Sequence, residues 1–328
     1  MMSVRFRHTI AYAASMIALM LLQTTLYFEP FARFSDFGTD VFYTLVSQIL
    51  CMGVVPFVIL IALNKGSAKE LFVRMRYKAP RDAKACLLIS LGMMLLITPY
   101  TMAFNALSNL LFRIIGYKKG LPIGTVYLGI GDFWLAVLMT AVLPAVFEEF
   151  TNRGVLLSGL QSRGSEYSAV IVSAVMFGLM HQNPSQMIFA VFGGLAFGVA
   201  AVKCDSIIPA MCAHFGNNVV AVILDYSTQK ETAFGVWYEK LFSSNSILSI
   251  AVVFFILGIS LYGMVKLLQY AARKAPKPVS EKKLLGLITL DAYSPEGKAT
   301  LKDNAFLYAT AVAEGAFVLI LLLWGILK

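Results

Sequence analysis

The sequence predicts an all-α protein, a polytopic transmembrane helical bundle of eight or nine helices, some of them short or broken. Of its 328 residues, 59% are hydrophobic and only 14% are charged, and the mean hydropathy is +0.75. These values lie far outside the range of soluble domains. The apolar residues form runs close to the roughly 20 residues that cross a bilayer. Although the net charge is +9, membrane lipids rather than nucleic acid are therefore the expected partners.

Each expected span is an apolar run between polar segments. The first run follows two arginines and a histidine, is too long for the apolar part of a signal peptide and lacks an A-x-A cleavage site, so it is expected to be a retained helix. The fifth to seventh runs are short and closely spaced, and are expected to be tilted, broken or partly re-entrant. In the sixth, Gly194 and Gly198 have the spacing that lets two helices approach closely. The runs are 9–28, 41–63, 85–113, 132–157, 168–182, 186–203, 206–224, 246–270 and 305–327.

The loops predict an orientation. Basic residues concentrate in the loops 64–84 and 273–303, whereas 29–40 and 225–245 contain more acidic than basic residues. The positive-inside rule places the basic loops and the N-terminus in the cytoplasm, and nine spans would place the C-terminus outside. The segment 273–304 is expected to be a polar linker before an isolated last helix.

Three charges interrupt the fourth run, "AVLPAVFEEFTNRGVL" at 141–156. Each charge near a bilayer centre costs about 2.5–3.5 kcal/mol on insertion scales, so compensation is expected. Glu149 and Arg153 are four residues apart and can form an ion pair on one helix face. Glu148 lies about 140° around the helix from Arg153. Either all three form one structural cluster, or Glu148 faces a water-filled cavity that a kink at Pro144 helps to open.

Two later segments add polar side chains. In "FGLMHQNPSQ", His181 follows Phe177 by four residues, and in "MCAHFGNN", His214 shares a helix face with Asn217 and Asn218. Each could simply be satisfied at an interface or hold helices together. Counting about 1.5 Å per residue along the predicted spans places Glu148, both histidines and Asn218 at a similar depth in the membrane. Such a set offers a base for water and donors for an oxyanion.

Together the motifs EExxxR (148–153), FxxxH (177–181) and HxxxN (214–218) resemble the CPBP family, which comprises type II CAAX prenyl endopeptidases and bacteriocin-processing enzymes. The resemblance covers roughly 130–225. It implies a glutamate-dependent intramembrane endopeptidase that cuts a membrane-associated peptide or protein and needs no metal or cofactor. It also suggests a bacterial cytoplasmic membrane as the location.

The resemblance also implies roles for individual residues. Glu148 would be the general base that activates water, supported by Glu149. His181 would help to hold or polarise the water, and His214 and Asn218 would stabilise the oxyanion. The expected supporting residues are Arg153, as the structural partner of Glu149, Phe177 and Asn217.

We expect three regions: N-terminal transmembrane helices over 1–130, a catalytic helical core over 131–225, and C-terminal helices with the polar linker over 226–328. Two alternatives remain open. One is a zinc-dependent protease with His181, His214 and a glutamate as ligands, although the sequence has no HExxH motif and no carboxylate evident to orient either imidazole. The other is a non-proteolytic immunity, scaffold or transport protein, although the repeated halves typical of transporters are not found.

Overall fold

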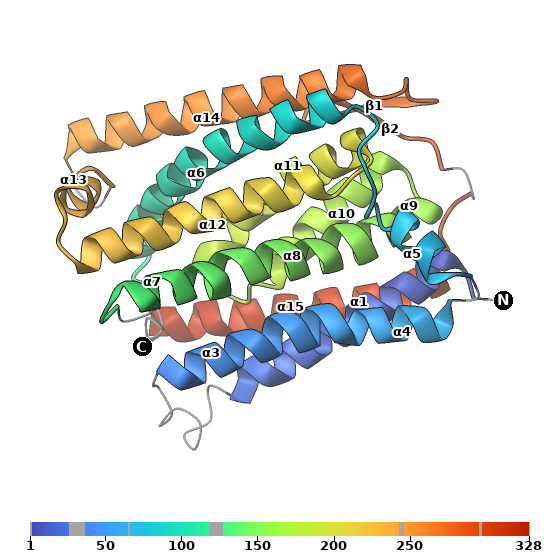
Figure 1. Cartoon of the computed structure of the whole chain (residues 1–328), viewed down its shortest axis with the longest axis horizontal. Coiled ribbons are helices and arrows are strands. Elements are labelled where there is room, and N and C mark those ends of the chain that lie inside the picture. Colours follow the sequence, from blue (N-terminus) through green and yellow to red (C-terminus); the bar gives the residue numbers. More distant parts are fainter. Residues whose placement is uncertain are drawn as a thin grey trace.

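A computed structural model of the chain describes residues 2–25, 37–64, 66–117, 127–242, 246–294 and 297–327. It confirms the polytopic helical bundle (Figure 1). In the described residues, seven helices are long and apolar enough to cross a membrane: Val41–Leu63, Ala83–Ile114, Ile130–Ser162, Pro184–Cys204, Ile208–Gln229, Ile247–Lys274 and Leu301–Leu327.

Several of these long helices are composite, with a π-helical segment between α-helical ones. The elements in chain order are α1 Val4–Thr25; α3 Phe37–Leu45, η1 Val46–Val54 and α4 Val55–Leu63; α5 Ala68–Arg74; α6 Ala83–Ile114; α7 Ile130–Ala136, η2 Val137–Val142, α8 Leu143–Glu149, η3 Phe150–Leu157 and α9 Ser158–Ser162; α10 Glu166–Leu179; α11 Pro184–Cys204; α12 Ile208–Gln229; α13 Ala233–Phe242; α14 Ile247–Lys274; β1 Glu281–Leu284; β2 Ile288–Asp291; and α15 Leu301–Leu327. Of these, η1, η2 and η3 are π-helical.

Each of the nine predicted runs contains a helix, but α1 and α10 are not among the seven long apolar ones. With 14 residues, α10 is about 21 Å long, which is shorter than the roughly 30 Å hydrocarbon core. The expectation of a short fifth segment is therefore confirmed. The sixth and seventh segments are not broken, because α11 and α12 are continuous helices of 21 and 22 residues, and their tilt stays a prediction. The apolar run of α12 ends before its helix does, since its last turns are polar.

The two ends of the bundle differ in what they carry. The N-terminus, α5 and the β-hairpin lie at one end, whereas α13 and the C-terminus lie at the other (Figure 1). The two basic loops thus share an end with the N-terminus, as the predicted orientation requires. Much of the predicted acidic loop 29–40 lies outside the described residues.

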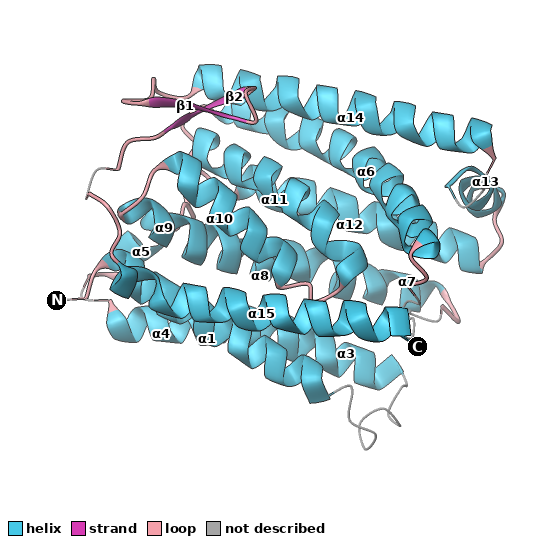
Figure 2. Ribbon diagram, turned by 180° about the vertical axis from the view of Figure 1, so that it is seen from behind, coloured by secondary structure: helices cyan, strands magenta, loops and turns pink. Residues whose placement is uncertain are grey.

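The last helix and the segment before it differ from the expectation. The predicted linker contains the antiparallel hairpin β1–β2, whose turn at Leu285 and Gly286 has positive φ at both residues. Such turns match the twist of paired strands. Leu284, Ile288 and Leu290 are buried, so the hairpin adds to the core. The last helix is not isolated either, because α15 lies beside α1 (Figure 2).

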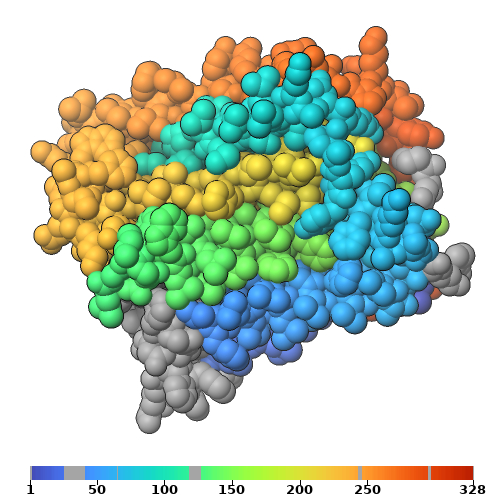
Figure 3. All heavy atoms as spheres, viewed as in Figure 1, coloured from blue at the N-terminus to red at the C-terminus, as the bar shows by residue number. Residues whose placement is uncertain are grey.

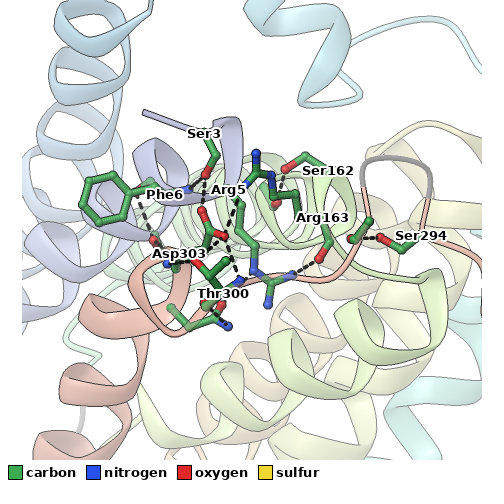
Figure 4. Close-up of polar contacts among 12 residues, drawn as sticks. Ser3, Arg5, Phe6, Ser162, Arg163, Ser294, Thr300 and Asp303 are labelled. Carbon is green, nitrogen blue, oxygen red and sulfur yellow. Dashed lines mark hydrogen bonds and ion pairs between the residues drawn. The ribbon is translucent and has the colours of Figure 1, made fainter. Parts of the chain in front are cut away.

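A polar cluster joins the start of α15 to the N-terminus (Figure 4). Asp303 accepts hydrogen bonds from Ser3 and, at 3.2 Å, from Arg163. Arg5 donates to the Asn304 side chain at 2.7 Å and to the Leu160 carbonyl at 2.6 Å. The first helix, the end of α9 and the last helix are therefore held together at this end of the bundle.

The interior is packed closely where small residues face one another. A Cβ atom at Gly194 would lie only 3.1 Å from Cα of Ala174, so α11 approaches α10 as the glycine spacing predicts. On the face seen in Figure 3, α6, α12, α8 and the helix of α3 and α4 follow one another. Helices from before and after the predicted core, residues 131–225, therefore lie beside it: α3, α4 and α6 come before it in the chain.

The orientation can be tested with reporter fusions. Fusions after Arg81 and after Lys240 are expected to report the cytoplasm and the outside, respectively, because a basic loop and a more acidic loop lie at opposite ends of the bundle. Alkaline phosphatase and green fluorescent protein fusions would measure this. Reporters that agree with each other would overturn the topology.

Candidate active site

The charged segment lies where one helix changes its geometry. Glu148 and Glu149 end α8, and Arg153 lies in the π-helical η3. A π-helix has i→i+5 hydrogen bonds, is rare, and is frequent at functional sites when it interrupts an α-helix. Because a π-helical turn is wider than an α-helical one, the residues after Glu149 lie at other angles around the helix axis than a regular α-helix would give them.

Glu149 and Arg153 form the ion pair that their spacing predicts. Arg153 Nη1 lies 3.1 Å from Glu149 Oε1, and both side chains are fully buried. Arg153 Nη2 also donates to the Gly194 carbonyl at 3.2 Å. The guanidinium carbon lies 4.3 Å from the ring centre of Phe177 and 5.3 Å from that of Phe197, within the range of cation–π attraction. Arg153 therefore ties α11 and α10 to the acidic segment.

His214 connects the two glutamates. Its Nδ1 lies 3.0 Å from Glu149 Oε1, and its Nε2 lies 3.9 Å from Glu148 Oε2. Because an ionised carboxylate only accepts, Nδ1 must carry a proton in this contact. The ring also stacks on Phe197, with centroids 5.7 Å apart. Spacing within single helices could not reveal the link to Glu149, because it joins α12 to α8.

Glu148 is held by a residue that the sequence analysis did not single out. Gln48 in η1 donates through Nε2 to Glu148 Oε1 at 3.0 Å. The Glu148 side chain is 12% exposed, and its Oε2 is buried without a hydrogen-bond partner among the described residues. The available sequence signal was a single glutamine in the apolar run "VSQILCMGVV".

His181 lies just beyond the short helix α10. Its Nδ1 donates to the Phe177 carbonyl at 2.7 Å, and its ring meets the Phe177 ring edge-on at 5.0 Å. His181 interacts electrostatically with Glu148 and His214. The structure thus brings the FxxxH segment next to the acids, with Phe177 in contact with both histidines.

The two asparagines of α12 contact each other and the acidic helix. Asn217 Nδ2 donates to Asn218 Oδ1 at 3.1 Å, and Asn218 Nδ2 donates to the Thr140 carbonyl at 2.9 Å. Pro144 has no N–H to give to this carbonyl, so the amide takes over that hydrogen bond. The π-helical segment η2 ends directly before α8, which begins with Leu143 and Pro144, and the kink and cavity expected at Pro144 stay predictions.

The site is rich in hydrogen-bond acceptors. Within the described part of the chain, the buried oxygens Gln48 Oε1, Glu148 Oε2, Glu149 Oε2 and Asn152 Oδ1 have no hydrogen-bond partner, and one buried donor, Arg153 Nε, has none either. Buried polar atoms are usually paired. Such a set favours a ligand that brings O–H or N–H groups, such as water or a peptide.

One observation in the structure supports the zinc alternative, and another argues against it. The expectation that no carboxylate orients an imidazole is wrong for His214, because Glu149 accepts from its Nδ1, as carboxylates behind metal-bound histidines do. Across the described residues, however, no group of three His, Cys, Asp or Glu side chains is placed to hold a metal ion. Glu148 and His214 alone would provide two ligands.

Comparison with known families adds to this geometry. Residues 130–220 match the family model described as type II CAAX prenyl endopeptidase Rce1-like. The matched segment contains all three motifs and begins with α7. No curated protein and no solved structure matches the chain.

The buried pair gives a stability prediction. Arg153→Ala leaves Glu149 buried with His214 as its one remaining partner among the described residues, and breaking a buried pair costs about 3–5 kcal/mol. Glu148→Gln keeps a side-chain oxygen for the Gln48 contact, so its loss should be much smaller. Thermal unfolding in detergent would measure both.

Arg81→Ala is the matched control, because Arg81 pairs with Asp205 at 3.2 Å from a side chain that is 55% exposed. Such a pair contributes about 0–1 kcal/mol. Equal losses for Arg153→Ala and Glu148→Gln would show that the pair is wrongly assigned.

Proposed function

We propose that this integral membrane protein is a CAAX-type endopeptidase in which Glu148 activates water to cut a peptide bond, and the family match of residues 130–220 supports the proposal. One observation carries the proposal. Glu148 has one carboxylate oxygen bound by Gln48 and the other facing His214 Nε2 at 3.9 Å. Two groups at this distance can share a bridging water.

In the proposed reaction, a water molecule gives one proton to Glu148 while its oxygen bonds to the carbon of the scissile carbonyl. The carbonyl electron pair moves onto oxygen and forms the tetrahedral oxyanion. When the C=O bond forms again, the C–N bond breaks, and Glu148 passes its proton to the leaving nitrogen. The immediate products are a carboxylic acid and an amine, and the glutamate is restored. The acid then gives its remaining proton to the amine, which leaves a carboxylate and an ammonium group.

The hydrogen bonds decide which groups can stabilise the oxyanion. The Nδ1 atoms of His181 and His214 already donate to protein oxygens. Their Nε2 atoms can donate only when the rings carry two protons, and otherwise accept from water. Asn218 has a second N–H on Nδ2 beyond the one given to Thr140, so it can donate in either case. We assign the oxyanion first to Asn218.

Glu149 and Arg153 act behind this layer. Glu149 fixes the orientation of the His214 ring through Nδ1, and Arg153 compensates the buried carboxylate. Orienting carboxylates of this kind set the tautomer of a histidine. Phe177 separates Arg153 from His181, and Asn217 orients the Asn218 amide.

The proposed substrate is a peptide segment of a membrane-associated protein, which is lipidated if the activity follows the family name. The proposed location is a bacterial cytoplasmic membrane with a cytoplasmic N-terminus. Comparing the proteomes of membranes that carry the wild-type chain or Glu148→Ala would identify the precursor that accumulates.

Replacing the proposed base is the first test. Glu148→Gln keeps the size and removes the basicity, so cleavage should fall about 100- to 10,000-fold while the protein still folds. A quenched peptide with a farnesylated cysteine followed by three residues, with an unprenylated peptide beside it, would report cleavage. In the wild type, activity should fall at low pH as the carboxylate takes up a proton.

Glu314→Gln is the matched control, since Glu314 is a fully buried glutamate of α15 that takes no part in the proposed reaction. The Glu314→Gln variant should cleave the quenched peptide at the wild-type rate. Near-normal turnover by Glu148→Gln would contradict the mechanism.

Metal dependence gives a second test. Extensively dialysed protein should keep its activity in chelator and contain substoichiometric zinc by elemental analysis, because a carboxylate base needs no Lewis acid. One zinc per chain, with cleavage lost on removal and regained on return, would turn Glu148 and His214 into metal ligands.

A further inference from the structure

Gln48 lies far outside residues 130–220, yet it contacts the proposed base directly. We propose, on the basis of the proposed function, that Gln48 is a positioning residue that binds one oxygen of Glu148 and turns the second oxygen toward the attacking water. The contact is between side chains 100 residues apart in sequence, at 3.0 Å in a site where Gln48 is buried.

The chemistry of the two groups fixes the orientation of the amide. An ionised carboxylate has no proton to donate, so the amide nitrogen of Gln48, and not its oxygen, must face it. Gln48 Oε1 then points elsewhere, and it has no partner in the described residues. An amide that leaves one buried oxygen unpaired is a poor choice for packing alone, which favours a role in the site.

The backbone around Gln48 is held from both sides. Ser15 of α1 donates to the Cys51 carbonyl at 2.7 Å, and Thr151 of η3 donates to the Met52 carbonyl. A Cβ atom at Gly53 would lie 2.8 Å from the Phe147 ring, so η1 approaches α8 closely. The helix that carries Gln48 lies next to α8 on the face shown in Figure 3. The donor is therefore placed by a rigid contact.

The donor should affect both the charge and the rotation of the carboxylate. A hydrogen bond to the ionised form favours that form. The same bond leaves Oε2 as the oxygen near His214 Nε2. The other charged or titratable groups around Glu148 are Glu149 and Arg153 on its own helix, His214 on α12 and His181 after α10. Replacing neutral Gln48 changes none of these charges.

Gln48→Met keeps the approximate length and removes the donor. A hydrogen bond to a charged group corresponds to about a 10- to 100-fold change in an equilibrium, so kcat should fall by a factor in that range while KM changes little. The acidic limb of the kcat profile should also move to higher pH. Full-length protein in lipid nanodiscs and the farnesylated quenched peptide would be used.

Ser47→Ala is the matched control. Ser47 is the buried neighbour of Gln48 in η1, and its hydroxyl donates to the Thr44 carbonyl of the same composite helix at 3.1 Å. Its pH profile should equal that of the wild type. Gln48→Leu provides a second variant that lacks the donor if the methionine variant does not fold.

Infrared titration reads the same carboxyl without any substrate. Subtracting the spectrum of Glu148→Gln protein, in each Gln48 background, isolates the protonated carboxyl band of Glu148. A band that grows in at higher pH in Gln48→Met than in the wild type supports the proposal, and an unchanged titration in a folded variant overturns it. If the wild type cleaves no peptide, the proposed function fails, while this titration still decides whether Gln48 holds Glu148.

Discussion

The buried ion pair between Glu149 and Arg153 is the interaction on which the arrangement of the site depends. It lies at the junction of α8 and η3, and each partner reaches a further helix, Arg153 to α11 and Glu149 to α12. Buried charges are costly unless paired and hydrogen-bonded. Satisfying this pair therefore draws together helices that contribute His214 and Phe177. Each of the two glutamates keeps one buried oxygen without a protein donor in the described structure, Oε2 in both cases, and Oε2 of Glu148 is the one that lies near His214 Nε2.

Three π-helical segments lie at the neighbouring acids. The segment η3 begins directly after Glu149 and carries Arg153, the partner of Glu149, while Glu148 also contacts Gln48 of η1. A second such segment, η1, carries Gln48, and a third, η2, leads to Pro144 and the carbonyl that Asn218 binds. All three meet at the proposed site, where departures from regular helix geometry are common.

The sequence predicted those features of the structure that depend on the order of residues within a single helix. The apolar runs predicted the helices, and the four-residue spacing predicted the Glu149–Arg153 pair. The contact of His214 with Glu149 depends on how α12 packs on α8, and neither helix alone encodes it. Gln48 carried no motif, and the buried leucines and isoleucine of the hairpin were hidden in a segment read as a polar linker. The length of α12 was also underestimated, because its last turns are polar and the apolar run ends before the helix does.

The central claim is that Glu148 Oε2 and the Asn218 amide face the reacting carbonyl from two sides. A high-resolution structure of the chain with a non-cleavable phosphonamidate peptide would test this most directly. The account predicts one phosphoryl oxygen within about 2.6–3.2 Å of Glu148 Oε2 and the other near Asn218 Nδ2. An analogue bound away from Glu148, or held by a metal ion between Glu148 and His214, would contradict it.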